Sequence, residues 1–335
     1  MSSPHGAGPP AGANGRTLDA DATRSYYGQP VIKEPVWTPE IPWYFFTGGL
    51  AGASAGLAQL AELRGCEELA RRAWATAGAA VLASPALLIS DLGRPARFMN
   101  MLRMVKLTSP MSVGSWVLAA SGASTSLAAA EALFPLPGAL ARLRPLARAA
   151  RPVSAVLGLP LSTYTGALIA QTAVPAWHEA RRELPTLFAA GAAASAGAAA
   201  TALTPPAEAA PARRLALLGV AAELAAMKLI EHRLGEASAS YHRDRAGRYA
   251  RAARGLTAAG ALVVAARAAH SRVAAAAGGA LILAGAVCER FSVFRAGFQS
   301  AADPRHTIGP QRRRVAAGQG HGASRGATPA ADSAA

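Results

Sequence analysis

Two charged side chains in one short loop are the clearest candidates for chemistry in this sequence. Asp91 and Arg94 stand three residues apart in the run Asp-Leu-Gly-Arg-Pro-Ala-Arg-Phe, residues 91–98. A carboxylate can relay protons, and a neighbouring guanidinium can orient it or polarise the oxygen of a bound molecule. The alternative is structural: Gly93 and Pro95 are typical of a helix end, and the Asp–Arg pair would then only fix the geometry of the loop.

The segments on either side of this loop explain why its charges matter. Residues 73–90 before it and residues 107–130 after it contain no Asp, Glu, Lys or Arg. Segments of this length and composition are typical of membrane-spanning helices, so the loop is predicted to join two of them at one membrane face. Carboxylates at membrane depth are costly, which makes Asp91 a functional candidate.

The composition of the whole chain indicates a membrane protein. Of 335 residues, 52% are hydrophobic and only 16% are charged, and the mean hydropathy is +0.21. These values exclude an ordinary soluble domain, and the many Ala and Gly residues suit helices that approach each other closely in lipid. The net charge of +15 does not indicate a nucleic-acid partner, because the arginines lie in short loops between apolar runs. Membrane lipid headgroups are the expected partners of these arginines.

Uncharged or nearly uncharged stretches that can cross about 30 Å of hydrocarbon predict an all-α, polytopic membrane helix bundle. About eight transmembrane helices are expected, with seven as the alternative, because one span is short before Arg267. The predicted spans are approximately 43–63, 72–92, 110–133, 153–175, 185–204, 212–232, 253–270 and 273–294.

Polar ends flank the bundle and define three regions. Residues 1–40 are predicted to be a polar, partly disordered arm, and they lack the basic start and apolar middle of a secretory signal. The aromatic and proline-rich second half of this arm could dock along a partner. Residues 41–296 form the transmembrane domain, and residues 297–335, with Arg312, Arg313 and Arg314, are predicted to be a basic disordered tail.

The distribution of Lys and Arg predicts the orientation. Eight spans place both termini on one side, and that side collects 22 of the 34 Lys and Arg residues. Cytoplasmic loops carry the excess of these residues. The chain is therefore expected in the cell inner (plasma) membrane, with the termini and the 91–98 loop in the cytoplasm.

Four further side chains are candidates for holding a ligand near this face. Tyr164 follows Pro160, whose helix kink can open space, and its hydroxyl can donate a hydrogen bond. Tyr44 and Trp43 open the first span and can line the same pocket, and Ser112 can add a small polar contact. The alternative is that the aromatic side chains pack or form an interfacial belt, while the serine caps a helix.

A second polar set lies deeper in the predicted bundle. Glu223 and Lys228 lie within one span, and Glu289 and Arg290 interrupt another. Buried charges must pair, so Glu223 and Lys228 are expected to pair with each other or with polar groups on neighbouring helices. A chain of such groups could conduct protons, and the alternative is a set of internal ion pairs that fixes helix register.

Four motifs together resemble the NrfD family, the membrane subunits of polysulfide-reductase-type complexes. They are residues 91–98, residues 109–116 (Ser-Pro-Met-Ser-Val-Gly-Ser-Trp), residues 43–50 (Trp-Tyr-Phe-Phe-Thr-Gly-Gly-Leu) and residues 161–166 (Leu-Ser-Thr-Tyr-Thr-Gly). The resemblance covers roughly residues 40–295, with the motifs in the same order and spacing. The Tyr- and Pro-containing arm also resembles members from formate-dehydrogenase-like gene neighbourhoods.

The resemblance implies a quinone-reactive membrane anchor that is not catalytic alone. Such a subunit binds menaquinone or ubiquinone and exchanges electrons with an iron–sulfur, ferredoxin-like subunit, which serves a molybdopterin catalytic subunit of a respiratory oxidoreductase. Asp91 and Arg94 would then act in proton transfer and polarisation at the quinone. Tyr164, Tyr44, Trp43 and Ser112 would bind it.

The sequence does not predict haem or a metal centre in this chain. Two cysteines, Cys66 and Cys288, cannot by themselves supply an iron–sulfur cluster or a four-ligand zinc site. A bis-histidine haem needs histidines that face each other within spans, whereas His232 and His270 lie near span ends. The resemblance likewise implies no haem and no iron–sulfur cluster here.

A different class of function is compatible with a basic helix bundle, namely a membrane transporter or a non-redox membrane scaffold. Many transporters contain inverted repeats, and no repeat is evident in this sequence. The absence of a repeat weakens the transporter alternative, and the loop motifs favour the redox subunit.

Reporter fusions test the predicted orientation. A fluorescent protein fused to the C-terminus is expected to be bright, because it folds in the cytoplasm, and alkaline phosphatase at the same place is expected to be inactive. The control is the same pair of reporters fused in the loop near residue 207, where the opposite pattern is expected. Active phosphatase at the C-terminus would place the 91–98 loop outside the cytoplasm.

Overall fold

The computed structural model describes residues 32–94, 96–134 and 137–303, and in this part the chain is helical with no strand. Eight of the described helices have 20 or more residues. They are α1 (Glu40–Leu63), α2 (Glu67–Asp91), α4 (Pro110–Leu133), α5 (Arg144–Ala170), α7 (Leu184–Leu203), α8 (Ala210–Leu234), α10 (Asp244–Arg267) and α11 (Arg272–Ala302). The short elements are α3 (Ala96–Leu102), α6 (Pro175–Glu179), α9 (Ala239–His242) and two 3₁₀ turns (Gly138–Leu143 and Gly235–Ser238).

The long helices coincide with the predicted spans, and the chain is an all-helical, multi-pass membrane protein. Four helices are both long and apolar enough to cross a membrane by length and composition: α2, α5 with the preceding turn, α7 and α11. Helices α1 and α4 contain many Gly, Ala and Ser residues in place of larger apolar ones, α8 contains Arg, Lys and Glu, and α10 contains several Arg. This composition lowers the mean hydropathy of these four helices, although each has at least 24 residues.

Local sequence signals set the helix ends next to the 91–98 loop. Gly93 has a φ of +65°, which L side chains rarely adopt, and α2 ends two residues earlier at Asp91. The side chain of Ser109 caps α4 by accepting a hydrogen bond from the Ser112 N–H, and Pro110 occupies the first position of the helix. The predicted helix end at Gly93 is thus confirmed, and the serine that caps α4 is Ser109, with Ser112 as its donor.

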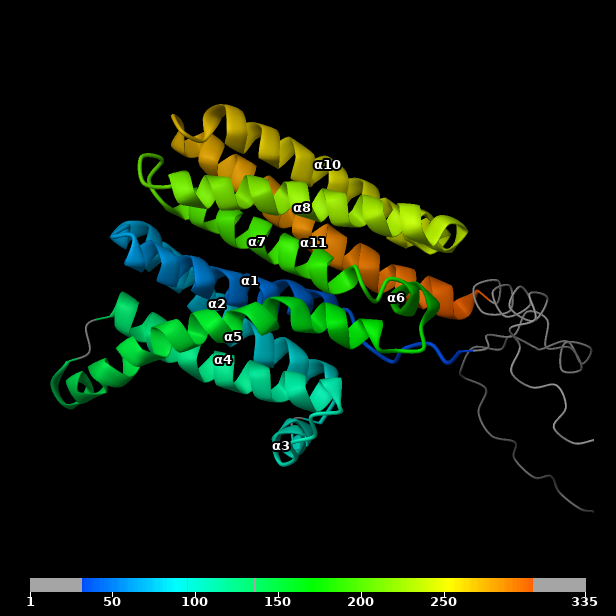
Figure 1. The fold of residues 1–335 in the computed structure, drawn as a ribbon, viewed down its shortest axis with the longest axis horizontal. Coiled ribbons are helices and arrows are strands. Elements are labelled where there is room, and N and C mark those ends of the chain that lie inside the picture. The colour runs from blue at the N-terminus through cyan, green and yellow to red at the C-terminus, as the bar shows by residue number, and fades with distance from the viewer. Residues whose placement is uncertain (1–31, 95, 135–136, 304–335) are drawn as a thin grey trace, which may run out of the picture.

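The long helices lie side by side as an elongated bundle with α7 near its centre (Figure 1). Helices α1, α2, α4 and α5 form one half of the bundle, and α7, α8, α10 and α11 form the other. Because α7 contacts α1 and α5 as well as α8 and α11, it joins the halves. Its apolar window is 72% buried, against 39–44% in the other three strongly apolar helices. The start of α1 and the end of α11 lie at the same end of the bundle.

Small residues determine how closely these helices approach. At the crossing of α1 and α5, a Cβ on Gly52 would lie 2.4 Å from the Gly158 carbonyl oxygen, and a Cβ on Gly158 would lie 2.4 Å from the Gly52 oxygen. No side chain fits there, so the two backbones touch directly. Close backbone approach of this kind supplies dispersion contacts that lipid cannot provide, since lipid is as apolar as the side chains.

Paired alanine substitutions on α1 test this crossing. Gly52→Ala is expected to lower the free energy of unfolding by about 1–3 kcal/mol, because the backbone of α5 must move. Gly56→Ala is the matched control four residues later, where nothing lies within 4 Å of an added Cβ. The control is expected to be neutral or to stabilise by roughly 0.5–1 kcal/mol. Thermal unfolding in detergent measures both, and equal effects would contradict the proposed contact.

Candidate functional site

A cavity of about 100 Å³ lies where α1 begins and α2 ends. Its walls come from the segment before α1 and from α1 to α5, and most of the lining is apolar, including Met101 and Met111. The polar side chains in the lining are Tyr44, Asp91, Ser115 and Tyr164. The structure therefore brings together three of the six residues predicted to form the site: Asp91, Tyr44 and Tyr164.

The two tyrosines place phenol groups at the cavity. Tyr44 is only 2% exposed, and its hydroxyl interacts with that of Tyr164 but makes no hydrogen bond of normal geometry to a described residue. A buried hydroxyl without a hydrogen bond costs about 1–3 kcal/mol. A ligand oxygen that accepts a hydrogen bond from it would recover this cost. Tyr164 fits because residue 114 is glycine: a Cβ on Gly114 would lie 1.8 Å from the Tyr164 ring. The small residue on α4 thus makes the space for the ring from α5.

Asp91 holds the chain segment that precedes α1. Its Oδ1 accepts hydrogen bonds from the Thr38 backbone N–H at 2.8 Å and from the Thr38 hydroxyl at 2.6 Å. Hydrogen bonds to a carboxylate are stronger than those between neutral groups. Asp91 therefore ties the end of α2 to the start of α1 and also lines the cavity, so the structural and the functional interpretations apply to the same side chain.

The sequence interpretation missed the aromatic cover beside this tether. Trp37 lines the cavity and stacks on Trp177 of α6, with ring centroids 5.5 Å apart. Trp177 is fully buried, and its Nε1 donates to the Val293 carbonyl oxygen at 2.8 Å. This part of the arm packs on its own chain. The other predicted docking residues of the arm, Tyr26 and Tyr27, lie outside the described residues.

A buried tyrosine fixes α6, the helix that carries Trp177. The Tyr241 hydroxyl of α9 donates to the Ala176 carbonyl oxygen at 3.0 Å. Burial raises the pKa of Tyr241 well above its ordinary value, and the nearby carboxylates Glu289 and Glu183 act in the same direction. The phenol therefore keeps its proton and remains a donor, so the aromatic cover does not depend on pH in the physiological range.

The other three predicted site residues do not line the cavity. Arg94 is exposed on the loop, and Trp43 is partly exposed, edge-on to Phe46 and Phe291. Ser112 accepts a hydrogen bond from the Lys106 N–H at 3.0 Å and donates to the Met104 carbonyl oxygen at 2.9 Å. It thereby fixes the end of the loop next to Met101 and Met111.

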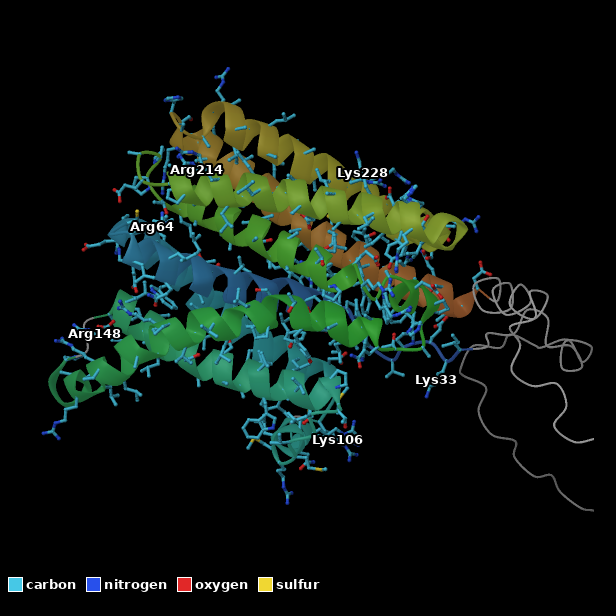
Figure 2. The ribbon with its side chains drawn as sticks, viewed as in Figure 1. Lys33, Arg64, Lys106, Arg148, Arg214 and Lys228 are labelled. Atoms are coloured by element: carbon cyan, nitrogen blue, oxygen red, sulfur yellow. The ribbon has the colours of Figure 1, made fainter. Side chains whose placement is uncertain are left out.

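Charged side chains concentrate at both ends of the bundle (Figure 2). Lys33 and Lys106 lie at the end that holds the cavity, and Arg64, Arg148 and Arg214 lie at the opposite end. This arrangement agrees with the way the sequence assigns these loops to two membrane faces. At the opposite end Arg151 bridges Glu62 of α1 and Glu131 of α4.

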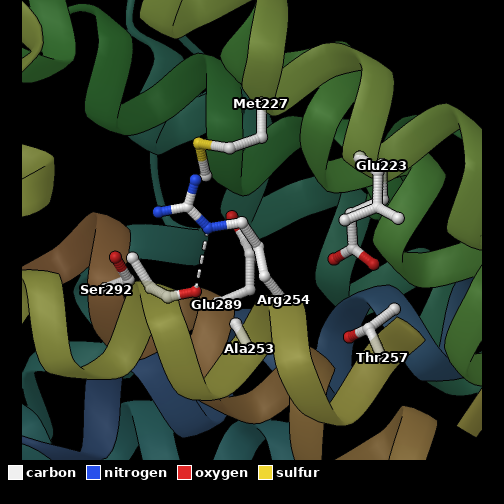
Figure 3. Close-up of a pocket in the computed structure, with 9 residues that line it drawn as sticks. Glu223, Met227, Ala253, Arg254, Thr257, Glu289 and Ser292 are labelled. Carbon is white, nitrogen blue, oxygen red and sulfur yellow. Dashed lines mark hydrogen bonds between the residues drawn. The ribbon is translucent and has the colours of Figure 1, made fainter. Parts of the chain in front are cut away.

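The deeper polar set forms a second small cavity, between α8, α10 and α11 (Figure 3). Glu223 and Glu289 both line it and are both buried. Lys228, by contrast, is exposed on the outer face of α8 (Figure 2), so it does not pair with Glu223. Glu289 pairs instead with the adjacent Arg290.

Comparison with known families gives one match. A family model described as "Polysulphide reductase, NrfD" matches residues 30–302, which include every described helix. The match begins before Trp37 and Thr38, so the cover and the tether of the cavity fall within it. A search among curated proteins finds no match for the chain.

Hydrogen exchange tests the hydrogen bonds that Asp91 accepts from Thr38. Asp91→Ala removes the acceptor of two hydrogen bonds, and exchange of the Thr38 amide is expected to become at least about tenfold faster, since such bonds contribute about 1.5–3 kcal/mol. Asp91→Asn keeps an oxygen in place and is expected to have a smaller effect. Unchanged exchange of Thr38 in Asp91→Ala would show that other contacts hold the segment.

Proposed function

Because the chain belongs to the polysulphide reductase NrfD family, we propose that it exchanges electrons between membrane quinone and an iron–sulfur partner subunit. The family identifies it as a membrane subunit of an oxidoreductase complex. In this proposal all eight long helices cross the membrane, and both termini lie on its cytoplasmic side. The chain anchors a ferredoxin-like subunit and, through it, a molybdopterin catalytic subunit.

The observation that carries this proposal is the pair of phenol hydroxyls, those of Tyr44 and Tyr164, in the lining of one mostly apolar cavity. A quinone presents two carbonyl oxygens on an apolar ring, so its site needs hydrogen-bond donors in an apolar wall. The cavity next to the 91–98 loop supplies both, with Tyr44 and Tyr164 as donors and mostly apolar lining elsewhere. These residues therefore fit the head group of menaquinone or ubiquinone.

The geometry also favours a head group that enters from the loop side. A cavity of about 100 Å³ is smaller than the roughly 300 Å³ of a typical ligand pocket, so side chains must move to admit a substituted ring. Met101 and Met111 are in the lining and belong to the loop end, and methionine side chains adapt readily. We expect these two side chains to turn aside when the ring enters.

In this proposal the side chains of the protein donate hydrogen bonds to the quinone and exchange protons with water. When bound, the quinone supplies two-electron redox chemistry that also requires two protons. Tyr44 and Tyr164 orient the carbonyl oxygens by donating hydrogen bonds. Asp91 has one oxygen occupied by Thr38, and its other oxygen remains to exchange a proton between the cavity and water. Arg94 is exposed on the loop, where it can attract a carboxylate of a partner.

We propose that the partner subunits dock at the same end of the bundle. That end carries the loop with Arg97, Arg103 and Lys106 and the connection between α8 and α10 with Arg243 and Arg245. A basic face of this kind steers an acidic protein or anionic lipid headgroups toward it. Docking there would bring an iron–sulfur cluster toward the cavity and leave the opposite end free. Nucleic acid is not expected as a partner.

Removal of one phenol oxygen tests the quinone site. Tyr44→Phe is expected to weaken quinone binding about fivefold, because one hydrogen bond contributes about 1 kcal/mol. The protein should keep its stability, since the hydroxyl makes no hydrogen bond of normal geometry that could be lost. Equilibrium binding of a quinone analogue to the purified chain in detergent measures the effect.

Tyr249→Phe is the matched control, because this tyrosine lies on α10 against Phe291 and outside the cavity. It is expected to leave binding unchanged. Quinone affinity that is the same in Tyr44→Phe, Tyr164→Phe and the control would contradict this site. A complex purified without any iron–sulfur subunit would contradict the electron-transfer function.

A further inference from the structure

The second small cavity is surrounded by charges that do not balance. Glu223 of α8 and Glu289 of α11 are each 4% exposed, and Arg290 is 2% exposed. Arg290 donates to Glu289 and to the Phe188 carbonyl oxygen, and its guanidinium lies over the Phe188 ring. Two carboxylates thus face one guanidinium, which leaves one negative charge in excess.

Glu223 is the carboxylate that lacks a counter-charge. Neither of its oxygens has a hydrogen-bond partner among the described residues, and no cation of the described chain lies within ion-pair distance. Lone buried carboxylates are too costly to remain ionised and take up a proton instead. The unoccupied Oε1 of Glu289 gives the same cluster a further free acceptor.

The surrounding residues leave room for this arrangement. A Cβ on Gly191 of α7 would lie 2.6 Å from Glu223 Oε1 and 2.8 Å from an Arg290 nitrogen, so only glycine admits both groups. The cavity beside them measures about 20 Å³, enough for one water molecule. In Figure 3 the Glu223 carboxylate and the Thr257 hydroxyl turn toward the same space between the helices.

One side chain connects this cavity to water. Arg254 of α10 lines the cavity, and its side chain is 40% exposed. It donates to Glu231 at 3.0 Å, and His242 lies 3.4 Å from the same carboxylate. Arg254 therefore extends from the lining of the cavity to the protein surface.

We propose that Glu223, Glu289 and Arg290 form a binding site for one proton, which Glu223 carries and exchanges with water past Arg254. The proton comes from the solvent and returns to it, with no other reactant. The remaining charged or titratable groups around the site are Glu231 on α8, Arg254 on α10 and Tyr241 and His242 on α9. Helix α7 contributes Phe188 and Gly191. This site lies in the other half of the bundle from the quinone cavity and does not depend on the proposed function.

Infrared spectroscopy of the full chain in detergent near neutral pH tests the proposal, because a protonated carboxylic acid has a carbonyl stretch that a carboxylate lacks. Glu223→Gln is expected to remove one such band, which shifts in D₂O in the unmodified chain. Glu289→Gln is expected to remove the same band, since Glu223 can then ionise as the sole counter-charge of Arg290. Glu62→Gln is the control, because Glu62 already pairs with Arg151 and should keep the band unchanged.

The two variants show whether Glu223 is protonated because the cluster has one negative charge too many or only because the side chain is buried. Loss of the band in both supports a single shared proton, whereas a band that survives in Glu289→Gln shows that Glu223 is neutral without regard to the cluster and overturns the proposal. Absence of the band from the unmodified chain also overturns it. A band that appears only when Na⁺ is removed would assign the site to a metal cation instead of a proton.

Discussion

The requirement that every backbone polar group be satisfied without water is the constraint on which this structure depends. Within hydrocarbon, helices meet it locally, and the chain is built almost entirely from them. Helix association then relies on close contact, which small residues permit. The direct backbone contact between α1 and α5 at Gly52 and Gly158 is the clearest case, and α7 owes its central position to the many Ala and Gly residues along it.

Because water is also scarce inside the bundle, each buried polar group needs a partner in the protein or a ligand, and its surroundings indicate the chemistry of the site. Two cavities of the described bundle differ in their chemistry: one is mostly apolar with phenol donors, and the other is lined by carboxylates and an arginine. The first lies in the half formed by α1 to α5, and the second lies between α8, α10 and α11. The proposed quinone site and the proposed proton site thus lie on different helices, with α7 between them.

Sequence reasoning located the helices and the loop well, but it predicted the site only in part. Each of the eight expected spans overlaps one of the eight long helices of the described chain, and four of these helices are apolar enough by composition to cross a membrane. Asp91, Tyr44 and Tyr164 line one cavity, as the motifs indicated. Arg94 and Trp43 point elsewhere, because the direction of a side chain at a helix end depends on neighbours that motif spacing does not specify.

The sequence by itself determined the class of protein, the approximate positions and order of the long helices, and the family, since these follow from hydropathy and from motifs. Only the tertiary structure decided which polar groups meet. It showed that Asp91 binds Thr38, that Trp37 covers the cavity with Trp177, and that Glu223 faces Arg290 and not Lys228. These contacts join residues far apart in the chain, and they depend on the rotation of each helix about its axis, which a nearly uniform Ala-rich sequence leaves undetermined.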